Sequence, residues 1–206
     1  AARTTPCRGL GAVVAWNVPQ VLIATKLAPA LLAGCSIVVK AAPEASLDAV
    51  ILAEVLAEAD LPPGVVSILT GGVEAGRALV GHRGVDKVAF TGSAAAGREI
   101  AATCGQQLKR VGLELGGKSA TIVLADADLD VLAAGLRFTS FMNNGQACAA
   151  QTRVLAPRSR YAELDVAPDP LALAGAGHRT DGGALHERVA HHQRGGHAEH
   201  GVDHRE

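Results

Sequence analysis

Two kinds of apolar segment alternate from residue 10 to about residue 162. Short runs rich in β-branched residues are followed by longer stretches in which apolar residues recur every three to four positions, the spacing of one helix face. The short runs predict strands at 11–15, 36–39, 65–69, 85–90 and 108–113; the longer stretches predict helices at 20–33, 46–60, 74–81 and 94–107. Strands that alternate with helices are typical of crossover connections, so we expect an α/β fold with a mainly parallel sheet.

Two local signals refine these elements. Ser93 comes directly before the helix predicted at 94–107 and can serve as its N-cap. Another helical pattern covers residues 131–143 and ends just before Asn144-Gly145-Gln146-Ala147-Cys148. A turn after that helix is therefore expected to present the sulfur of Cys148.

The pattern stops after Leu164. Seven of the eight histidines lie between His178 and His204, among Ala, Gly, Arg, Asp and Pro residues with no sustained period. Such a composition lacks the apolar surface that offsets the entropy cost of ordering a chain, so we expect a disordered tail. The alternative is metal binding through His186, His191, His192, His197 and His200.

Composition narrows the class of protein. The 206 residues are 49% hydrophobic, enough for one good-sized core, and the mean hydropathy is +0.23. The net charge of −1 argues against nucleic acid or an anionic membrane as partner and favours a small-molecule protein. Lys26 and Pro29 interrupt the apolar run at 21–32, so we expect no transmembrane helix.

The four cysteines, at positions 7, 35, 104 and 148, are widely separated. No Cys-x-x-Cys pair is present, and no histidine stands near them at metal-ligand spacing, which argues against structural zinc. Without evidence of secretion, we expect reduced thiols in a cytoplasmic setting.

Three residues could together perform covalent chemistry on a carbonyl carbon: Cys148 as nucleophile, Glu114 as base and Asn17 as amide donor to an oxyanion. Glu114 stands in the apolar run 111–115, where a buried carboxylate would have the raised pKa of a general base.

Each of the three also has a purely structural interpretation. Cysteine is often a small core residue. Glu114 could be a strand-end charge that faces solvent or pairs with Lys118, and Asn17 could cap the first helix.

Two further segments suggest anion or nucleotide binding. Phe90-Thr91-Gly92-Ser93-Ala94-Ala95-Ala96-Gly97 predicts a strand, a tight turn and a helix start, which would present backbone N–H groups to an anion. Lys40 ends a strand and could bind a ribose or balance a phosphate, although many strand-end lysines simply extend into water.

Taken in order, these segments resemble the aldehyde dehydrogenase superfamily. The resemblance rests on Ala15-Trp16-Asn17-Val18-Pro19, Lys26-Leu27-Ala28-Pro29-Ala30-Leu31, Val38-Val39-Lys40, Leu61-Pro62-Pro63-Gly64, Phe90-Thr91-Gly92-Ser93, Leu113-Glu114-Leu115-Gly116-Gly117-Lys118 and Gly145-Gln146-Ala147-Cys148. The base-to-nucleophile spacing agrees, since 148 minus 114 gives 34. The resemblance covers roughly residues 3–163.

The resemblance implies oxidation of an aldehyde to a carboxylic acid with NAD(P)+. Cys148 would form a thiohemiacetal, with its oxyanion held by Asn17 and the Cys148 backbone N–H, and then a thioester that water activated by Glu114 hydrolyses. Lys26 stands at the position of a lysine that, in the family, is sometimes given the role of relaying protons. The implied cofactor contacts are Trp16, Lys40, Glu44, Gly71, Thr91, Gly92, Ser93, Gly97 and Leu115.

Some positions depart from the family pattern. The acidic residue that marks NAD preference is expected at Pro43 but comes one position later, at Glu44, so NAD is favoured with NADP possible. Ala94, Ala95 and Ala96 have small side chains where members of the family commonly carry larger residues against the adenine. The presence of Glu114 separates the chain from the coenzyme A-acylating branch, which makes water the expected acyl acceptor.

The resemblance also implies a domain organisation. Residues 1–115 would form a Rossmann-like cofactor domain without its first part, residues 116–163 the beginning of the catalytic domain, and residues 164–206 an unmatched tail, for which we hypothesise a reading-frame shift near Leu164. Full-length members form homo-oligomers, an assembly that is doubtful for so short a chain. Two alternatives stay open: an inactive fragment with residual nucleotide binding, and a thiol-dependent esterase.

Overall fold

A computed structural model describes residues 8–165, which form two compact units divided between Gly116 and Gly117. The first unit alternates strands and helices in the order β1 (Gly9–Val13), α1 (Pro19–Leu32), β2 (Ser36–Ala41), α2 (Ser46–Ala57), β3 (Val66–Thr70), α3 (Val73–Gly81), β4 (Lys87–Gly92), α4 (Ala94–Gln106) and β5 (Arg110–Leu115). All five strands are parallel, in the order β3-β2-β1-β4-β5. The predicted α/β fold with a parallel sheet is confirmed.

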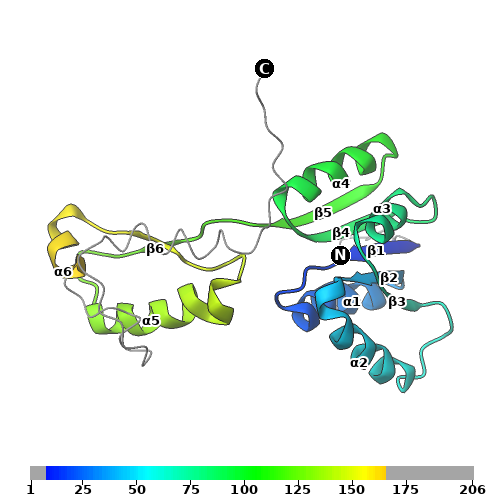
Figure 1. Cartoon of the computed structure of the whole chain (residues 1–206), viewed down its shortest axis with the longest axis horizontal. Coiled ribbons are helices and arrows are strands. Elements are labelled where there is room, and N and C mark those ends of the chain that lie inside the picture. Colours follow the sequence, from blue (N-terminus) through cyan, green and yellow to red (C-terminus); the bar gives the residue numbers. More distant parts are fainter. Residues whose placement is uncertain (1–7, 166–206) are drawn as a thin grey trace. The chain divides into compact units, whose positions relative to one another are not determined.

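Helices cover both faces of this sheet. Side chains alternate between faces along a strand, so neighbouring residues of β1 join different cores. Leu10 and Ala12 pack with Ile23 of α1, whereas Val13 packs in a second core with Val88 and with residues of α3 and α4. Figure 1 shows the same division, with α1 and α2 on one side of the sheet and α3 and α4 on the other.

The strand order reverses between β1 and β4. The chain first builds outward from β1 through β2 to β3, and then crosses to the opposite side of β1 to build β4 and β5. In parallel α/β sheets, ligands bind beyond the carboxyl ends of the strands at such a switch point. The segments that follow β1 and β4 are therefore the expected place for a ligand.

The second unit contains β6 (Ala120–Ile122), α5 (Leu129–Phe141), the short helix η2 (Met142–Gly145), β7 (Arg153–Leu155), η3 (Arg158–Arg160) and α6 (Tyr161–Asp165). β6 and β7 pair in parallel. Asp128 caps α5, because its carboxylate accepts hydrogen bonds from the backbone nitrogens of Asp130 at 2.9 Å and Val131 at 3.1 Å.

Most predicted elements are present with ends displaced by a few residues. Ser93 caps α4 as expected, since its Oγ accepts a hydrogen bond from Ala96 N at 3.2 Å. The histidine-rich tail after Leu164 lies almost wholly outside the described residues. Between residues 8 and 165, no helix is both long and apolar enough to cross a membrane.

Candidate functional site

Lys26 and Thr91 meet on one face of the first unit's sheet. Lys26 lies in α1 and is 9% exposed, while Thr91 lies near the carboxyl end of β4 and is 7% exposed. The Lys26 Nζ donates a hydrogen bond to Thr91 Oγ1 over 2.6 Å. An ammonium group removed from water needs such an acceptor, because an unpaired buried charge is strongly destabilising.

Glu114 is the acidic neighbour of this pair. It stands opposite Thr91 in the β4–β5 register, so the two residues share a face of the sheet. Burial lowers the pKa of Lys26 below its ordinary 10.5, and the negative charge of Glu114 partly offsets that effect. Lys26, Thr91 and Glu114 therefore form one electrostatic cluster.

The environment of Glu114 differs from the sequence-based expectation. The apolar run 111–115 predicted a buried carboxylate, but the Glu114 side chain is exposed. The reason is the place of β5, which is an edge strand with β4 as its one neighbour in the sheet. An edge strand has fewer neighbouring side chains to cover it, so three of its residues before Leu113 are exposed as well.

Lys40 lies near the carboxyl end of β2 and is 7% exposed. Burial lowers the pKa of its ammonium group, and the charge of Glu44 acts in the opposite direction. Its aliphatic chain passes Gly76 of α3, where an added Cβ would lie 3.9 Å from Lys40 Cδ. The alternative in which this lysine simply extends into water is wrong.

Trp16 and Asn17 follow β1, on the carboxyl side of the sheet. Trp16 is 43% exposed, so its ring is available to a ligand. Asn17 comes one residue before Val18, which is the N-cap of α1 and makes no side-chain cap hydrogen bond. The N-cap residue of α1 is therefore Val18, and Asn17 directly precedes it.

Gly92 ends β4, Ser93 connects it to α4, and the first turn of α4 contains Gly97. Gly97 is buried against the end of β5: a Cβ there would lie 2.6 Å from Leu115 Cδ2. A glycine at this position lets helix and strand approach closely, because no side chain stands between them. Gly71 directly follows β3, at the same end of the sheet.

Cys148 belongs to the second unit and is exposed, as the predicted turn requires. The chain that leads to it has an unusual backbone, because Asn143, Asn144 and Gly145 have φ values of 53°, 56° and 75°. Glycine and asparagine are the residues that adopt this left-handed region most readily. The Asn-Asn-Gly sequence is therefore enough to predict this conformation.

Two residues that hold this turn were missed by the sequence reasoning. Ser140 Oγ donates to Gln151 O over 2.8 Å, and Gln151 N donates to Thr139 O over 3.0 Å. Neither the residue types nor their spacing predicts this contact. The partners are eleven residues apart and belong neither to one helix nor to paired strands.

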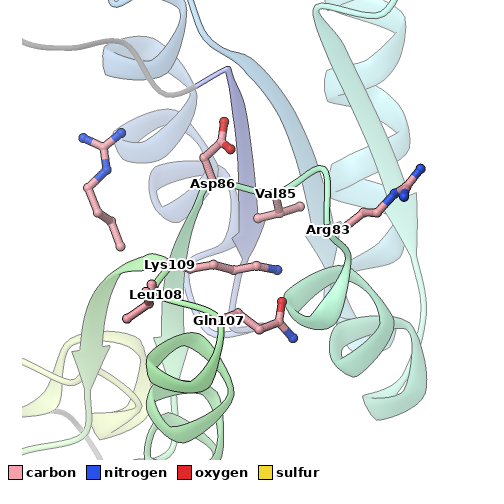
Figure 2. A pocket seen from close by; sticks show the side chains of 7 residues that line it. Arg83, Val85, Asp86, Gln107, Leu108 and Lys109 are labelled. Carbon is pink, nitrogen blue, oxygen red and sulfur yellow. The ribbon is translucent and has the colours of Figure 1, made fainter.

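A pocket of about 380 Å³ lies at the opposite end of the sheet, where β4 and β5 begin (Figure 2). Two of its polar side chains already have structural partners. Lys109 Nζ donates to the carbonyl oxygens of Val80 and His82, each over 2.7 Å, and Asp86 Oδ2 accepts from Arg8 N at 2.8 Å and Gly9 N at 3.0 Å. The backbone hydrogen bonds from Gly9 and Arg8 lower the pKa of Asp86. The pocket is thus distant from the strand ends where a ligand is expected.

No cluster of three or more His, Cys, Asp or Glu side chains suited to a metal ion occurs within the part of the chain that the structure describes. The histidines proposed as an alternative metal site lie outside that part.

Comparison with known proteins gives the family. The model of the aldehyde dehydrogenase family matches residues 2–167. Geranial dehydrogenase of Castellaniella defragrans is 54% identical over 162 residues, which are 79% of this chain and 34% of that protein. Betaine aldehyde dehydrogenase of Amaranthus hypochondriacus is 48% identical over 160 residues, 77% of this chain and 32% of that protein.

A solved structure agrees with the fold. The aldehyde dehydrogenase of Mycobacterium tuberculosis complexed with NAD+ superimposes with a TM-score of 0.75 at 53% identity, over 77% of this chain and 33% of that one. The chain thus spans about a third of the length of the relatives that it matches. The family model that matches residues 2–167, together with these relatives, shows that the chain belongs to the aldehyde dehydrogenase family.

Proposed function

We propose that this chain carries the cofactor-binding part and the nucleophile of an enzyme that oxidises an aldehyde to a carboxylic acid with NAD+. The observation that carries the proposal is the exposed Cys148 that follows the left-handed residues Asn143, Asn144 and Gly145, in a chain of which residues 2–167 match the aldehyde dehydrogenase family. The overall reaction converts an aldehyde, NAD+ and water into an acid, NADH and one proton.

The first step belongs to Cys148. Its thiolate attacks the aldehyde carbon and forms a carbon–sulfur bond, while the carbonyl π electrons move to oxygen. The oxyanion of this thiohemiacetal accepts hydrogen bonds from the Asn17 side chain and the Cys148 backbone N–H. A bound nicotinamide would supply the hydride acceptor, and loss of hydride from the carbon would leave a thioester on Cys148.

The second step belongs to Glu114. Its carboxylate takes a proton from water, the resulting oxygen nucleophile attacks the thioester carbon, and the carbon–sulfur bond breaks to release the acid and the Cys148 thiolate. Lys26 shares an electrostatic cluster with Glu114, and its lowered pKa makes it a better proton carrier near neutral pH than an exposed lysine. The contact between Lys26 and Thr91 fixes the position of that group.

Chain connectivity is compatible with this pairing of base and nucleophile. In the second unit, an added Cβ on Gly117 would lie 3.7 Å from Cys148 O, so the backbone at Gly117 passes beside the nucleophile's own backbone. Glu114 precedes Gly117 by three residues, which span at most about 11 Å.

The residues at the carboxyl ends of the strands fit a dinucleotide. The N-terminus of α4 favours an anion such as the pyrophosphate, and Gly97 allows close packing of that helix on β5. Lys40, with Glu44, would hold the adenosine ribose, and Trp16, Gly71, Thr91, Gly92, Ser93 and Leu115 would line the rest. The NAD+ complex of the Mycobacterium tuberculosis relative supports NAD as cofactor, with NADP as the alternative.

Aldehyde-dependent production of NADH, followed at 340 nm, tests the proposal. Geranial and betaine aldehyde are the first substrates to try, because two relatives are named for them. Cys148→Ser should abolish the signal. Glu114→Gln should give one rapid equivalent of NADH per chain followed by slow turnover, because the thioester forms but is not hydrolysed.

Two other outcomes would favour the alternatives. Binding of NAD+ without any aldehyde-dependent NADH would indicate a non-catalytic nucleotide-binding chain. Ester hydrolysis that persists without NAD+ but stops after alkylation of Cys148 would indicate a thiol esterase. NADH production that survives Cys148→Ser would contradict the mechanism itself.

A further inference from the structure

The nucleophile lies on a loop whose two ends are joined. This segment, the Cys148 loop (residues 140–151), leaves the last turn of α5 and leads to β7. At its base, Ser140 Oγ donates to Gln151 O over 2.8 Å and Gln151 N donates to Thr139 O over 3.0 Å. Residues eleven and twelve positions apart are thereby held together at the base of the loop.

Gln151 is also bound to the sheet of the second unit. Thr121, in the middle of β6, donates from Oγ1 to Gln151 Oε1 over 3.1 Å. Ser140 itself is 4% exposed. A buried hydroxyl group that lost its partner would be left without water to replace it, so this bond matters more than a surface one.

The interior of the loop needs this support. Asn143 and Asn144 hold left-handed backbone angles, which non-glycine residues keep only where the surroundings impose them. Inside the loop, two turn hydrogen bonds are present, Gln146 N to Asn143 O at 3.0 Å and Ala150 N to Ala147 O at 3.1 Å. Cys148 lies in the second of these turns, so its position depends on how the loop ends are held.

We propose that Ser140, acting through Gln151, is a positioning residue that holds the Cys148 loop in one conformation and thereby sets the environment of the thiol. Its importance for catalysis rests on the proposed function. Its effect on the thiol does not, because it can be measured without aldehyde or cofactor.

The variant Ser140→Ala removes the hydroxyl group and little else. Thr139→Val is the matched control, because the Thr139 hydroxyl donates to Gly135 O within α5 over 3.0 Å and its loss leaves the loop base intact. Hydrogen exchange of the backbone amides of Gln146, Ala150 and Gln151 reports on the loop. We expect Ser140→Ala to accelerate their exchange about tenfold, the effect of one lost buried hydrogen bond, and Thr139→Val to leave it nearly unchanged.

The second measurement is the rate at which iodoacetamide alkylates Cys148 as a function of pH, followed by mass spectrometry of the Cys148 peptide. A synthetic peptide of residues 144–152 gives the profile of the same thiol without a fixed loop. At a given pH the wild-type rate should differ from that of the peptide, because the fixed loop limits the approach of the reagent to the sulfur, and the Ser140→Ala rate should move toward that of the peptide. The Thr139→Val profile should stay with the wild type.

Three results would overturn the proposal. Unchanged exchange in Ser140→Ala would show that the base hydrogen bond does not hold the loop, and equal acceleration in Thr139→Val would show a general effect of helix destabilisation. An alkylation rate that stays at its wild-type value in Ser140→Ala would show that the hydrogen bond at the loop base does not set the thiol's environment. Because neither experiment requires NADH production, a failure of the proposed function would be seen separately.

Discussion

The hydrogen bond between Lys26 and Thr91 allows a quantitative test of the cluster. Thr91→Val keeps the shape of a side chain that is 7% exposed but removes the oxygen 2.6 Å from the Lys26 Nζ. A hydrogen bond to a charged group contributes about 1.5–3 kcal/mol, so Thr91→Val should lower the free energy of unfolding by about 2 kcal/mol. Removing both partners is expected to cost far less than the sum of the single changes.

The assay is a double-mutant cycle of Thr91→Val and Lys26→Met in urea. The single tryptophan, Trp16, follows β1 and provides a fluorescence signal from the first unit. The coupling energy should be about 1–2 kcal/mol. Thr25→Val is the control, because the Thr25 hydroxyl donates to Leu22 O on the exposed side of the same helix and its loss should cost less than about 0.5 kcal/mol. A coupling energy below about 0.5 kcal/mol would refute the inference that the two side chains form a unit.

Two further predictions concern stability. Because the pKa of Lys26 is lowered on folding, the unfolded chain binds more protons between the folded pKa and 10.5, and stability rises with pH in that window. The free energy of unfolding of the wild type relative to Lys26→Met, from urea titrations at several pH values, should therefore increase from neutral pH toward 10.5, and a constant or falling difference would contradict the assignment. Gly9→Ala would place a methyl group against the carbonyl oxygen of Gly84 and should cost about 1–3 kcal/mol. Gly135→Ala, with nothing within 4 Å in the middle of α5, should stabilise by about 0.5–1 kcal/mol, so thermal melting curves that shift in the same direction for both would be unexpected.

Much of the local structure could be predicted from the sequence. The N-cap at Ser93 and the turn before Cys148 each depend on residues within a few positions of one another. The local sequence is therefore sufficient to predict them. The ends of strands were less accurate. β1 begins at Gly9 rather than at the predicted residue 11 because its extent follows its register with β2, in which Gly9 stands beside Ser36.

The motifs by themselves identified the family and the chemical groups, because each is a short stretch whose residue types suit one chemistry. Only the tertiary structure decided how those groups are surrounded. It made β5 an edge strand and so exposed Glu114, it buried Lys40, and it joined Lys26 to Thr91 across 65 positions of sequence. It also joined Ser140 to Gln151 at the base of the loop that carries Cys148. Burial and long-range hydrogen bonds are set by which elements become neighbours, and that choice depends on the packing of the whole sheet and its helices rather than on any one segment.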